Sequence, residues 1–169
     1  MSEGCSAYLF WIKVVSILIL CSIMNDMKLK IVTIGEPKLF FAKEGFGEYI
    51  KRLGAFHKID VVYLKDSVRD EKILSKIGNS FFVVLDEHGK EFSSRGLAQF
   101  LDKKALESVG EMSFLIGGPD GHSDVLRERA EYLWSFGKLT FPHDMAMVIL
   151  AEALYRASTI NANHPYHRE

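Results

Sequence analysis

The end of the chain brings together several side chains that can contact nucleic acid. Residues 161–169 contain His164, Tyr166, His167 and Arg168, so imidazoles, a phenol and a guanidinium lie within a few positions of one another. Aromatic rings and arginine planes are the groups that stack on the bases of single-stranded RNA. These residue types therefore favour RNA contact, although chain ends more often have no function.

The same histidines raise the alternative of a metal site. His164 and His167 have a spacing that a metal ion can use, and His143 is a third imidazole. No aspartate, glutamate or cysteine is convincingly placed to complete the set, so we expect no bound metal.

Three glycine-containing segments offer a second kind of site, which is made of backbone. They are residues 85–89, 117–121 and 136–141, and each follows or surrounds a short apolar run. Glycine lets a ligand approach the main chain closely, although glycines after strands are most often ordinary turns. None of the segments matches the dinucleotide fingerprint or a P-loop, and the chain has no Gly-x-Ser-x-Gly nucleophile elbow.

The elements that must position these groups alternate between short β-branched runs and longer helical patterns. This alternation indicates βαβ units, so we expect one α/β domain with a mostly parallel sheet flanked by helices. Ligands of such sheets bind beyond the carboxyl ends of the strands, where the glycine-containing segments would lie. The predicted strands cover residues 29–34, 59–64, 81–85, 112–116 and 138–141, and the predicted helices cover 40–53, 65–77, 93–106, 123–134 and 144–157.

The last predicted helix differs from the others because its first half is apolar on every side. Residues 145–151 are all apolar, and such a helix must be covered by protein all round. Glu152 and Arg156 follow with the i, i+4 spacing that brings opposite charges together. One interpretation is a core helix with an ordinary surface ion pair, and the other is a helix enclosed by the fold or by a second subunit.

Charge is distributed unevenly along the 169 residues. The chain has 21 lysines and arginines against 22 aspartates and glutamates, but residues 1–26 contain only Glu3, Lys13 and Asp26 among them. Residues 27–169 are therefore neutral overall, and they contain no cysteine. Balanced charge argues against a strongly basic nucleic-acid coat protein. The lack of cysteine excludes a disulfide scaffold, a cysteine zinc finger and a cysteine nucleophile from this part of the chain.

Residues 1–26 are expected to lie outside the fold. Residues 8–24 are apolar apart from Lys13 and two serines, but a lysine inside a membrane span is costly. Met27 opens directly into a strand pattern, which favours a leader or an over-extended start. A membrane-proximal anchor and an added helix are the alternatives. We therefore place the domain at residues 27–169 and do not expect a membrane partner.

Several segments occur in one order that resembles a known family. This series resembles the bacterial ribosomal RNA large subunit methyltransferase H family, whose members are small SPOUT-class enzymes. The resemblance begins at Met27 and extends over essentially all of the remaining chain. The matching segments are residues 28–35, 45–53, 85–86, 115–121, 139–143, 151–157 and 163–169, and the last of them reads Asn-His-Pro-Tyr-His-Arg-Glu.

The resemblance implies transfer of a methyl group from S-adenosylmethionine to N3 of a pseudouridine. The target would lie in the helix 69 loop of 23S rRNA on assembled ribosomes, which places the enzyme in the cytoplasm. The resemblance also implies a homodimer and a SPOUT α/β-knot, a deep trefoil knot near the C-terminus that forms the cofactor cleft. The apolar final helix would pass through the knot and pack on the partner subunit.

The resemblance also assigns residues to a cofactor site and an RNA site. We expect Arg156 and Arg168 to contact RNA phosphate or the uracil oxygens, and Tyr166 and His167 to form the target-base pocket. The base that removes the N3 proton is not assigned, and the histidines named above are candidates. The cofactor candidates, which would act mainly through their backbone, are Leu85, Gly117, Gly118, Phe136, Gly137, Lys138, Leu139, Thr140 and Phe141.

Two other functions are compatible with the residues alone. A nucleotide-binding α/β regulatory module could use the same glycine-containing segments without methyl transfer, and preferential binding of S-adenosylmethionine over NAD and ATP would exclude it. A membrane-anchored interaction protein would use residues 8–24 as its anchor. A native protein that starts at Met27 and is found in the soluble fraction would exclude this second alternative.

Overall fold

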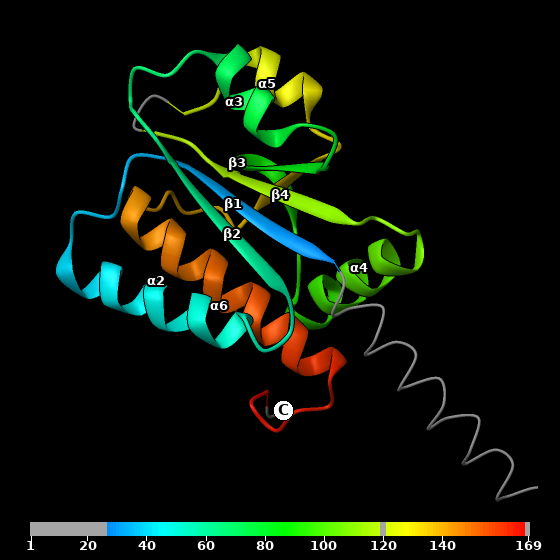
Figure 1. Ribbon diagram of the computed structural model, residues 1–169. Coiled ribbons are helices and arrows are strands. Elements are labelled where there is room, and N and C mark those ends of the chain that lie inside the picture. Colours follow the sequence, from blue (N-terminus) through cyan, green and yellow to red (C-terminus); the bar gives the residue numbers. More distant parts are fainter. Residues whose placement is uncertain (1–26, 119–120, 168–169) are drawn as a thin grey trace, which may run out of the picture.

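A five-stranded sheet with helices on both faces makes up the fold (Figure 1). The computed structural model describes residues 27–118 and 121–167. The strand order is β2-β1-β4-β3-β5 and every pairing of neighbouring strands is parallel, which confirms the predicted class. The elements are β1 (Lys28–Ile34), α2 (Phe40–Leu53), β2 (Lys58–Leu64), α3 (Asp70–Ile77), β3 (Phe81–Glu91), α4 (Ser94–Leu106), β4 (Glu111–Ile116), α5 (Asp124–Arg129), β5 (Tyr132–Ser135) and α6 (His143–Asn161).

The central strands are buried on both faces because successive side chains point to opposite sides of the sheet. Val83 and Phe114 belong to one core cluster, which α2, α4 and α6 complete. Their neighbours Val84 and Leu115 belong to the other cluster, which α3 and α5 cover. Figure 1 shows these two helical layers on opposite sides of the sheet.

Helix α6 is not enclosed on every side by this chain, because Met145, Val148 and Ile149 in its apolar first half are only half-buried. Met147, Leu150 and Leu154 are fully buried, and α2 and α4 both contact the helix. The helix is longer than predicted and ends at Asn161, whose side-chain amide donates to the carbonyl of Ala98 in α4 at 2.9 Å. That a second subunit packs on α6 stays a prediction, and so does the trefoil knot.

Strand β3 is longer than predicted. The segment 85–89, expected to be a loop after the strand, lies within β3 (Phe81–Glu91), so that prediction was wrong. After the pairs that end with Leu85 and Trp134, the register shifts and Lys90 also pairs with Trp134. The shift produces an irregularity between Leu85 and Lys90, which is the reason why the local sequence resembles a turn.

The predicted helix at 123–134 forms but ends early, and the predicted strand at 138–141 was wrong. Helix α5 ends at Arg129, the last strand is β5, and residues 138–141 form part of a loop. A short apolar run does not distinguish helix from strand by periodicity. Pairing with β3 makes this segment a strand. The Glu131 carboxylate accepts the Phe82 N–H at 2.6 Å, and the Glu131 N–H donates to the Phe82 carbonyl at 2.9 Å.

The remaining predictions agree with the structure apart from element ends. Ser93 caps α4 by accepting the Gly96 N–H at 3.0 Å, whereas α3 begins only at Asp70. Across residues 27–118 and 121–167, no helix is both long and apolar enough to cross a membrane. Residues 8–24, the candidate anchor, lie outside the described residues.

Candidate functional site

The carboxyl ends of β4 and β5 and the middle of β3, from Leu85 to Glu87, surround a cavity of about 650 Å³. Every predicted cofactor residue except Lys138 lines this cavity, so the three glycine-containing segments do meet in space. Lys138 is exposed to solvent. The other lining residues are Asp86, Glu87, Ile116, Gly121, His122, Arg127, Trp134, Ser135, Pro142, His143 and Ala146.

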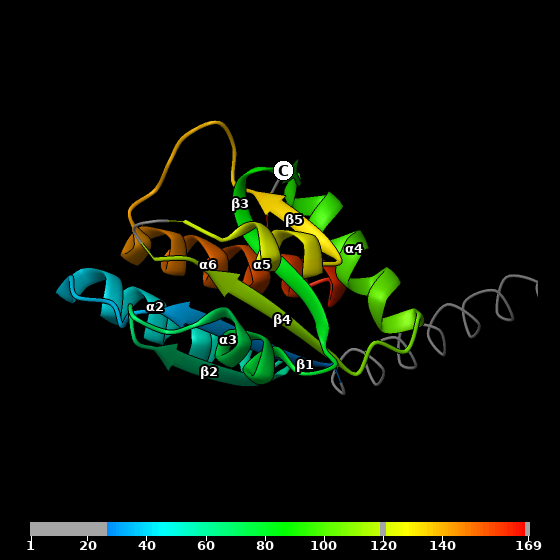
Figure 2. The same cartoon turned by 90° about the horizontal axis from the view of Figure 1, so that it is seen from above.

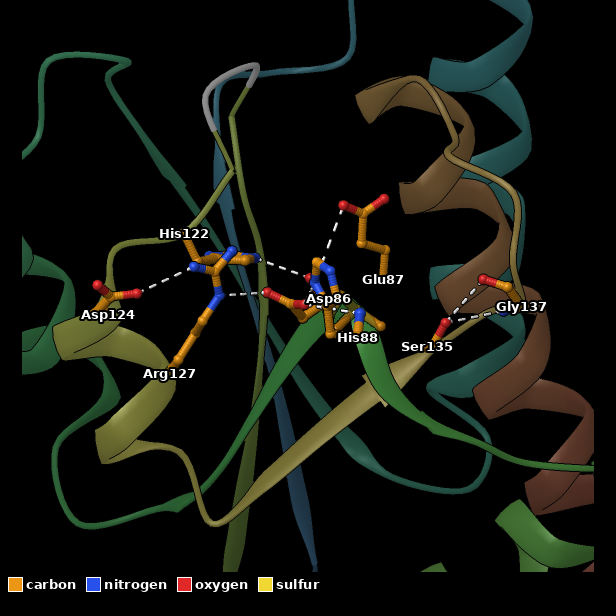
Figure 3. A network of polar contacts seen from close by, with 9 residues as sticks. Asp86, Glu87, His88, His122, Asp124, Arg127, Ser135 and Gly137 are labelled. Atoms are coloured by element: carbon orange, nitrogen blue, oxygen red, sulfur yellow. Dashed lines mark hydrogen bonds and ion pairs between the residues drawn. The ribbon is translucent and has the colours of Figure 1, made fainter.

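The loop after β5 is held in a turn by a serine. The Ser135 hydroxyl donates to the Gly137 carbonyl at 2.9 Å and accepts the Gly137 N–H at 3.1 Å (Figure 3). Gly137 has a φ of 128°, a conformation that strongly favours glycine. Beyond this turn the loop arches away from the sheet before it enters α6 (Figure 2). Leu139, which lines the cavity from this loop, is 73% exposed.

His122 connects the ends of β3 and β4. Its Nε2 lies 2.9 Å from the Leu85 carbonyl, and a carbonyl can only accept, so Nε2 carries the proton. Burial lowers the pKa of His122 below the usual histidine value, which keeps the ring neutral at pH 7. Its Nδ1 is buried and has no hydrogen-bond partner among the described residues. Gly117 lies against the ring, because a Cβ at this position would be 2.9 Å from Cε1 of His122.

Asp86 is a buried carboxylate in the cavity wall, with a side chain that is 2% exposed. It accepts Nε–H of Arg127 at 2.7 Å and the backbone N–H of His88 at 2.9 Å (Figure 3). Burial by itself would raise the pKa of Asp86, but these hydrogen bonds outweigh burial and lower it. Asp86 is therefore charged at neutral pH, and its ion pair attaches α5 to β3.

The first turn of α6 is attached to the segment before α2. Oδ2 of Asp144 accepts the backbone N–H groups of Lys38 and Leu39 at 2.7 and 2.6 Å, and Oδ1 lies 3.2 Å from Nδ1 of His143. Burial would raise the pKa of Asp144, but the bonds from Leu39, His143 and Lys38 lower it. His143 lines the cavity, and its Nε2 is buried with no hydrogen-bond partner in the part of the chain that the structure describes.

The predicted RNA-binding residues form a separate cluster near the C-terminal end of α6. Glu152 and Arg156 make the predicted ion pair, and Glu152 also accepts the Tyr166 hydroxyl at 3.1 Å. The Tyr49 hydroxyl lies 3.3 Å from that of Tyr166. The Arg156 guanidinium lies over the Tyr166 ring at 5.3 Å, and one of its nitrogens is 3.5 Å from Nδ1 of His167.

These contacts set the protonation states of the cluster. Burial raises the pKa of Tyr166 far above 10, and the hydrogen bonds with Tyr49 and Glu152 raise it further. The hydrogen bond to Glu152 raises the pKa of Arg156. The phenol is therefore a neutral donor at physiological pH, and the guanidinium is permanently charged.

The cavity and the C-terminal cluster lie at opposite ends of α6. Ala146 lines the cavity, and Arg156 lies about 15 Å further along the helix axis. One chain therefore does not bring its cofactor candidates and its RNA candidates together. Arg168 lies outside the described residues.

Sequence analysis missed the residues that support the cavity. Arg127 pairs with Asp86 across 41 positions, and Asp144 binds the N–H of Lys38 across 106 positions, so no local pattern could reveal them. His122 follows directly after a glycine-containing segment, and this was the one usable signal. Within the described residues, no group of three or more histidine, cysteine, aspartate or glutamate side chains could hold a metal ion.

Comparison with known proteins agrees with this architecture. A family model described as "Predicted SPOUT methyltransferase" matches residues 27–167. The ribosomal RNA large subunit methyltransferase H of Deinococcus radiodurans is 51% identical over 145 residues, which cover 84% of this chain and 99% of the relative. The protein of the same name from Streptococcus agalactiae is 38% identical over 159 residues, with coverage of 84% and 100%.

Among solved structures, a probable methyltransferase from Bordetella pertussis Tohama I shares the fold. Its TM-score is 0.52 at 9% identity, and the match covers 81% of this chain and 98% of that chain. The matched family model and the curated relatives define the class of protein as a methyltransferase. The chain belongs to the SPOUT methyltransferase family.

Proposed function

We propose that this enzyme methylates N3 of a pseudouridine in the helix 69 loop of 23S rRNA, on assembled ribosomes in the cytoplasm. The methyl donor is S-adenosylmethionine, and the methyltransferase domain is residues 27–169, with residues 1–26 outside it. The names of the relatives support ribosomal RNA as the substrate class. The observation that carries the proposal is the convergence of Leu85, Gly117 and the loop at 136–141 on one cavity.

The residues of the cavity fit this cofactor. A volume of about 650 Å³ is within the range of small-molecule sites. Gly117, Gly118 and Gly137 line it and leave main-chain amides and carbonyls accessible to a ligand.

S-adenosylmethionine supplies a methyl group on a sulfonium that is already activated for displacement. The residues around the cavity therefore contribute chiefly by orientation, which in well-aligned cases accounts for roughly 7–11 kcal/mol of a barrier. Backbone groups at Leu85, Gly117 and Gly118 would hold the donor, together with the loop at 136–141. Displacement would need the attacking nitrogen opposite the sulfur, so the residues that hold the donor would also have to leave its methyl group accessible to RNA.

The N3–H group of the target base must also lose its proton. His143 is a cavity-lining imidazole with an acidic partner, because its Nδ1 lies 3.2 Å from Oδ1 of Asp144. A proton on Nδ1 leaves the lone pair on Nε2, the nitrogen without a partner in the described part of the chain. We assign proton removal to Nε2 of His143, since geometry is the first requirement of a general base.

The RNA side of the site comes from a second copy of the chain in this proposal. Arg156 and Arg168 contact phosphate or the uracil oxygens, and Tyr166 and His167 form the target-base pocket. Because the described part of this cluster lies at the far end of α6 from the cavity of the same chain, a homodimer is needed to bring the two together. Phe40, which is 79% exposed at the start of α2, supports an apolar contact between copies.

The test is the modification state of 23S rRNA from cells that lack this gene. Mass analysis and primer extension should show the loss of one methyl group from one pseudouridine, and a plasmid copy should restore it. A Gly118→Val copy should fail to restore it, because a Cβ at this position would lie 3.2 Å from Cγ2 of Ile34 and the larger side chain would displace the backbone that lines the cavity. Unchanged methylation in the deletion strain would refute the proposed target. Calorimetric titration with S-adenosylmethionine, NAD and ATP separates a methyltransferase from a nucleotide-binding regulator.

A further inference from the structure

His122 contacts two of the cavity-forming segments, and the proposed reaction gives it no role. The residue is only 8% exposed. Its Nε2 donates to the Leu85 carbonyl at 2.9 Å. Its ring also lies against Gly117, where a Cβ would be 2.9 Å from Cε1 and 3.0 Å from Nε2. The His122 ring therefore determines the distance between two cofactor candidates, Gly117 after β4 and Leu85 in β3.

The residue next to Leu85 is held from the same side. The Asp86 carboxylate accepts Nε–H of Arg127 at 2.7 Å (Figure 3). His122 and Arg127 belong to one short stretch, because α5 begins at Asp124 directly after the turn that contains His122. This stretch binds two consecutive residues of β3, so it determines the direction in which the Leu85 carbonyl points.

Only one form of the His122 ring can make these contacts. Nε2 must carry a proton to donate to Leu85, and a second proton on Nδ1 would create a buried cation with no hydrogen-bond acceptor among the described residues. The charged groups nearest to the ring are Asp86 from β3, which favours the cation, and Arg127 from α5, which opposes it. Burial lowers the pKa of His122 and outweighs the hydrogen bond to Leu85 and the charge of Asp86, which both raise it.

We propose that His122 is a positioning residue of the cofactor site, which fixes the Leu85 carbonyl as an acceptor for the N–H groups of the cofactor. The proposal rests on the proposed function, because it takes that cofactor to be S-adenosylmethionine. His122 acts through Leu85 and does not touch the reacting atoms. Its loss should therefore weaken cofactor binding and leave the rate at saturating cofactor nearly unchanged.

The test compares two substitutions that differ in hydrogen bonding. His122→Leu removes the donor, whereas the side-chain amide of His122→Gln can still donate to the Leu85 carbonyl. We expect S-adenosylmethionine to bind on the order of tenfold more weakly to His122→Leu, and within about threefold of the wild type to His122→Gln. The value of kcat for ribosome methylation should change less than KM for the cofactor.

A matched control is available in His57, another buried histidine. It is 2% exposed, and its Nε2 lies 2.9 Å from Oγ of Ser158, in the C-terminal half of α6 and away from the cavity. His57→Gln should leave the cofactor affinity unchanged, even if it lowers the melting temperature. Melting curves of all three variants identify any loss of affinity that arises only from unfolding.

The pH dependence gives a readout that a merely structural role would not change. In the wild type, cofactor affinity should be constant through neutral pH and should fall only in acid, below the usual titration range of histidine, as Nδ1 takes up a proton. In His122→Gln this fall should be absent. The comparison needs only the wild type and the glutamine variant, so it remains decisive if His122→Leu does not fold.

The outcomes separate this proposal from the proposed function. Wild-type protein that fails to bind S-adenosylmethionine refutes both. Wild-type binding together with unchanged affinity in His122→Leu refutes only the role of His122. Equal weakening in the leucine and glutamine variants, with the same acid profile as the wild type, also refutes it, because the donor to Leu85 would then be irrelevant.

Discussion

Gly89 is the position where β3 and β5 leave no room for a side chain. A Cβ there would lie 2.6 Å from the carbonyl carbon of Leu133 and 2.7 Å from that of Trp134. Both atoms belong to the backbone of β5, which cannot rotate away as a flexible side chain can. The close approach coincides with the register shift in β3, so Gly89 allows the strand to return to β5 beyond the cavity.

We therefore expect Gly89→Ala to lower the free energy of unfolding by about 1–3 kcal/mol, as overpacking does in other proteins. Gly110→Ala is the control, because nothing lies within 4 Å of a Cβ at that position. Urea unfolding followed by circular dichroism measures both variants. Equal stability of the two would show that β5 can shift without cost.

Tyr166 should resist ionisation in alkaline solution. Its pKa is raised far above 10, mainly by burial and then by Tyr49 and Glu152. Because the folded-state pKa exceeds the unfolded value, the stability from this group is present below pH 10 and is lost as the pH rises beyond it. The absorbance of tyrosinate at 295 nm should show almost no difference between the wild type and Tyr166→Phe at pH 10–11. If the absorbance of the two proteins differed in this range by the amount that one ionised tyrosine contributes, the packing of the C-terminal cluster would be contradicted.

At the level of residues, sequence analysis found the groups that could contact ligands but not the groups that hold them. The resemblance correctly grouped Leu85, Gly117 and the loop at 136–141 around one cavity, Lys138 apart. The i, i+4 pair of Glu152 and Arg156 was visible from spacing alone. The carboxylate of Asp144 accepts N–H groups from a distant segment, and the guanidinium of Arg127 donates to the distant Asp86, so neither has a local signal.

Among the elements, α5 depends most on its neighbours. It is only six residues long, and isolated helices of this length are not stable in water. Leu126 is its buried apolar contact with the sheet, and Ser123, its N-cap, donates to Asp70 of α3 at 2.6 Å. Arg127 adds the ion pair with Asp86. Since α5 follows the glycine segment of β4, any loosening of the helix reaches the cavity wall.

Removal of the Arg127 guanidinium should destabilise this region. We expect Arg127→Met to lower the free energy of unfolding at pH 7, because the buried Asp86 carboxylate loses a charged partner. The pKa of Asp86 is lowered in the folded protein, so this contribution is present above its usual value of 3.8 and is lost as the pH falls below it.

The control for this substitution is Arg129→Met, since Arg129 is an exposed residue of the same helix. Thermal unfolding at pH 7 and at pH 3 measures both variants. The difference between them should be large at pH 7 and smaller at pH 3. A difference that is independent of pH would mean that packing of the arginine stem, and not its charge, is what matters.

The architecture was more predictable than the ends of its elements. Buried runs such as 112–116 and the amphipathic pattern of 40–53 determined the parallel α/β class, because burial on both faces requires continuous apolar strands. The region from 123 to 141 was not predictable, since pairing of Tyr132–Ser135 with β3 overrides its local pattern. The same pairing explains why residues 138–141, although apolar in part, remain outside the sheet.

At the level of the whole molecule, the main feature is the distance between the cavity and the C-terminal cluster. The cavity lies at the start of α6, whereas the C-terminal cluster lies toward its end. In the proposed dimer, the C-terminal cluster of each subunit serves the cavity of the other. A neutral domain then concentrates its few RNA-binding cations at one place without a large basic surface.

This arrangement predicts complementation between two inactive variants. Gly117→Val should damage the cavity by clashing with His122, and His167→Ala should damage the RNA cluster. If each site combines two subunits, co-refolded variants should recover about one quarter of wild-type activity, because half of the dimers are mixed and each mixed dimer has one intact site. Tritiated methyl transfer to ribosomes measures the recovery. Two separately purified variants that stay inactive after mixing and refolding would refute a shared site.

The burial of α6 also has a consequence for motion. Amide hydrogens in its middle, around Met147 and Leu150, lie in the largest core cluster and should exchange with solvent only when the whole domain unfolds. The loop between β5 and α6 has an exposed leucine at its tip and no regular structure, so its amides should exchange through small local openings. Exchange of one cofactor molecule for another can therefore proceed at the rate of loop movement, while the helix that connects both sites stays rigid through many catalytic cycles.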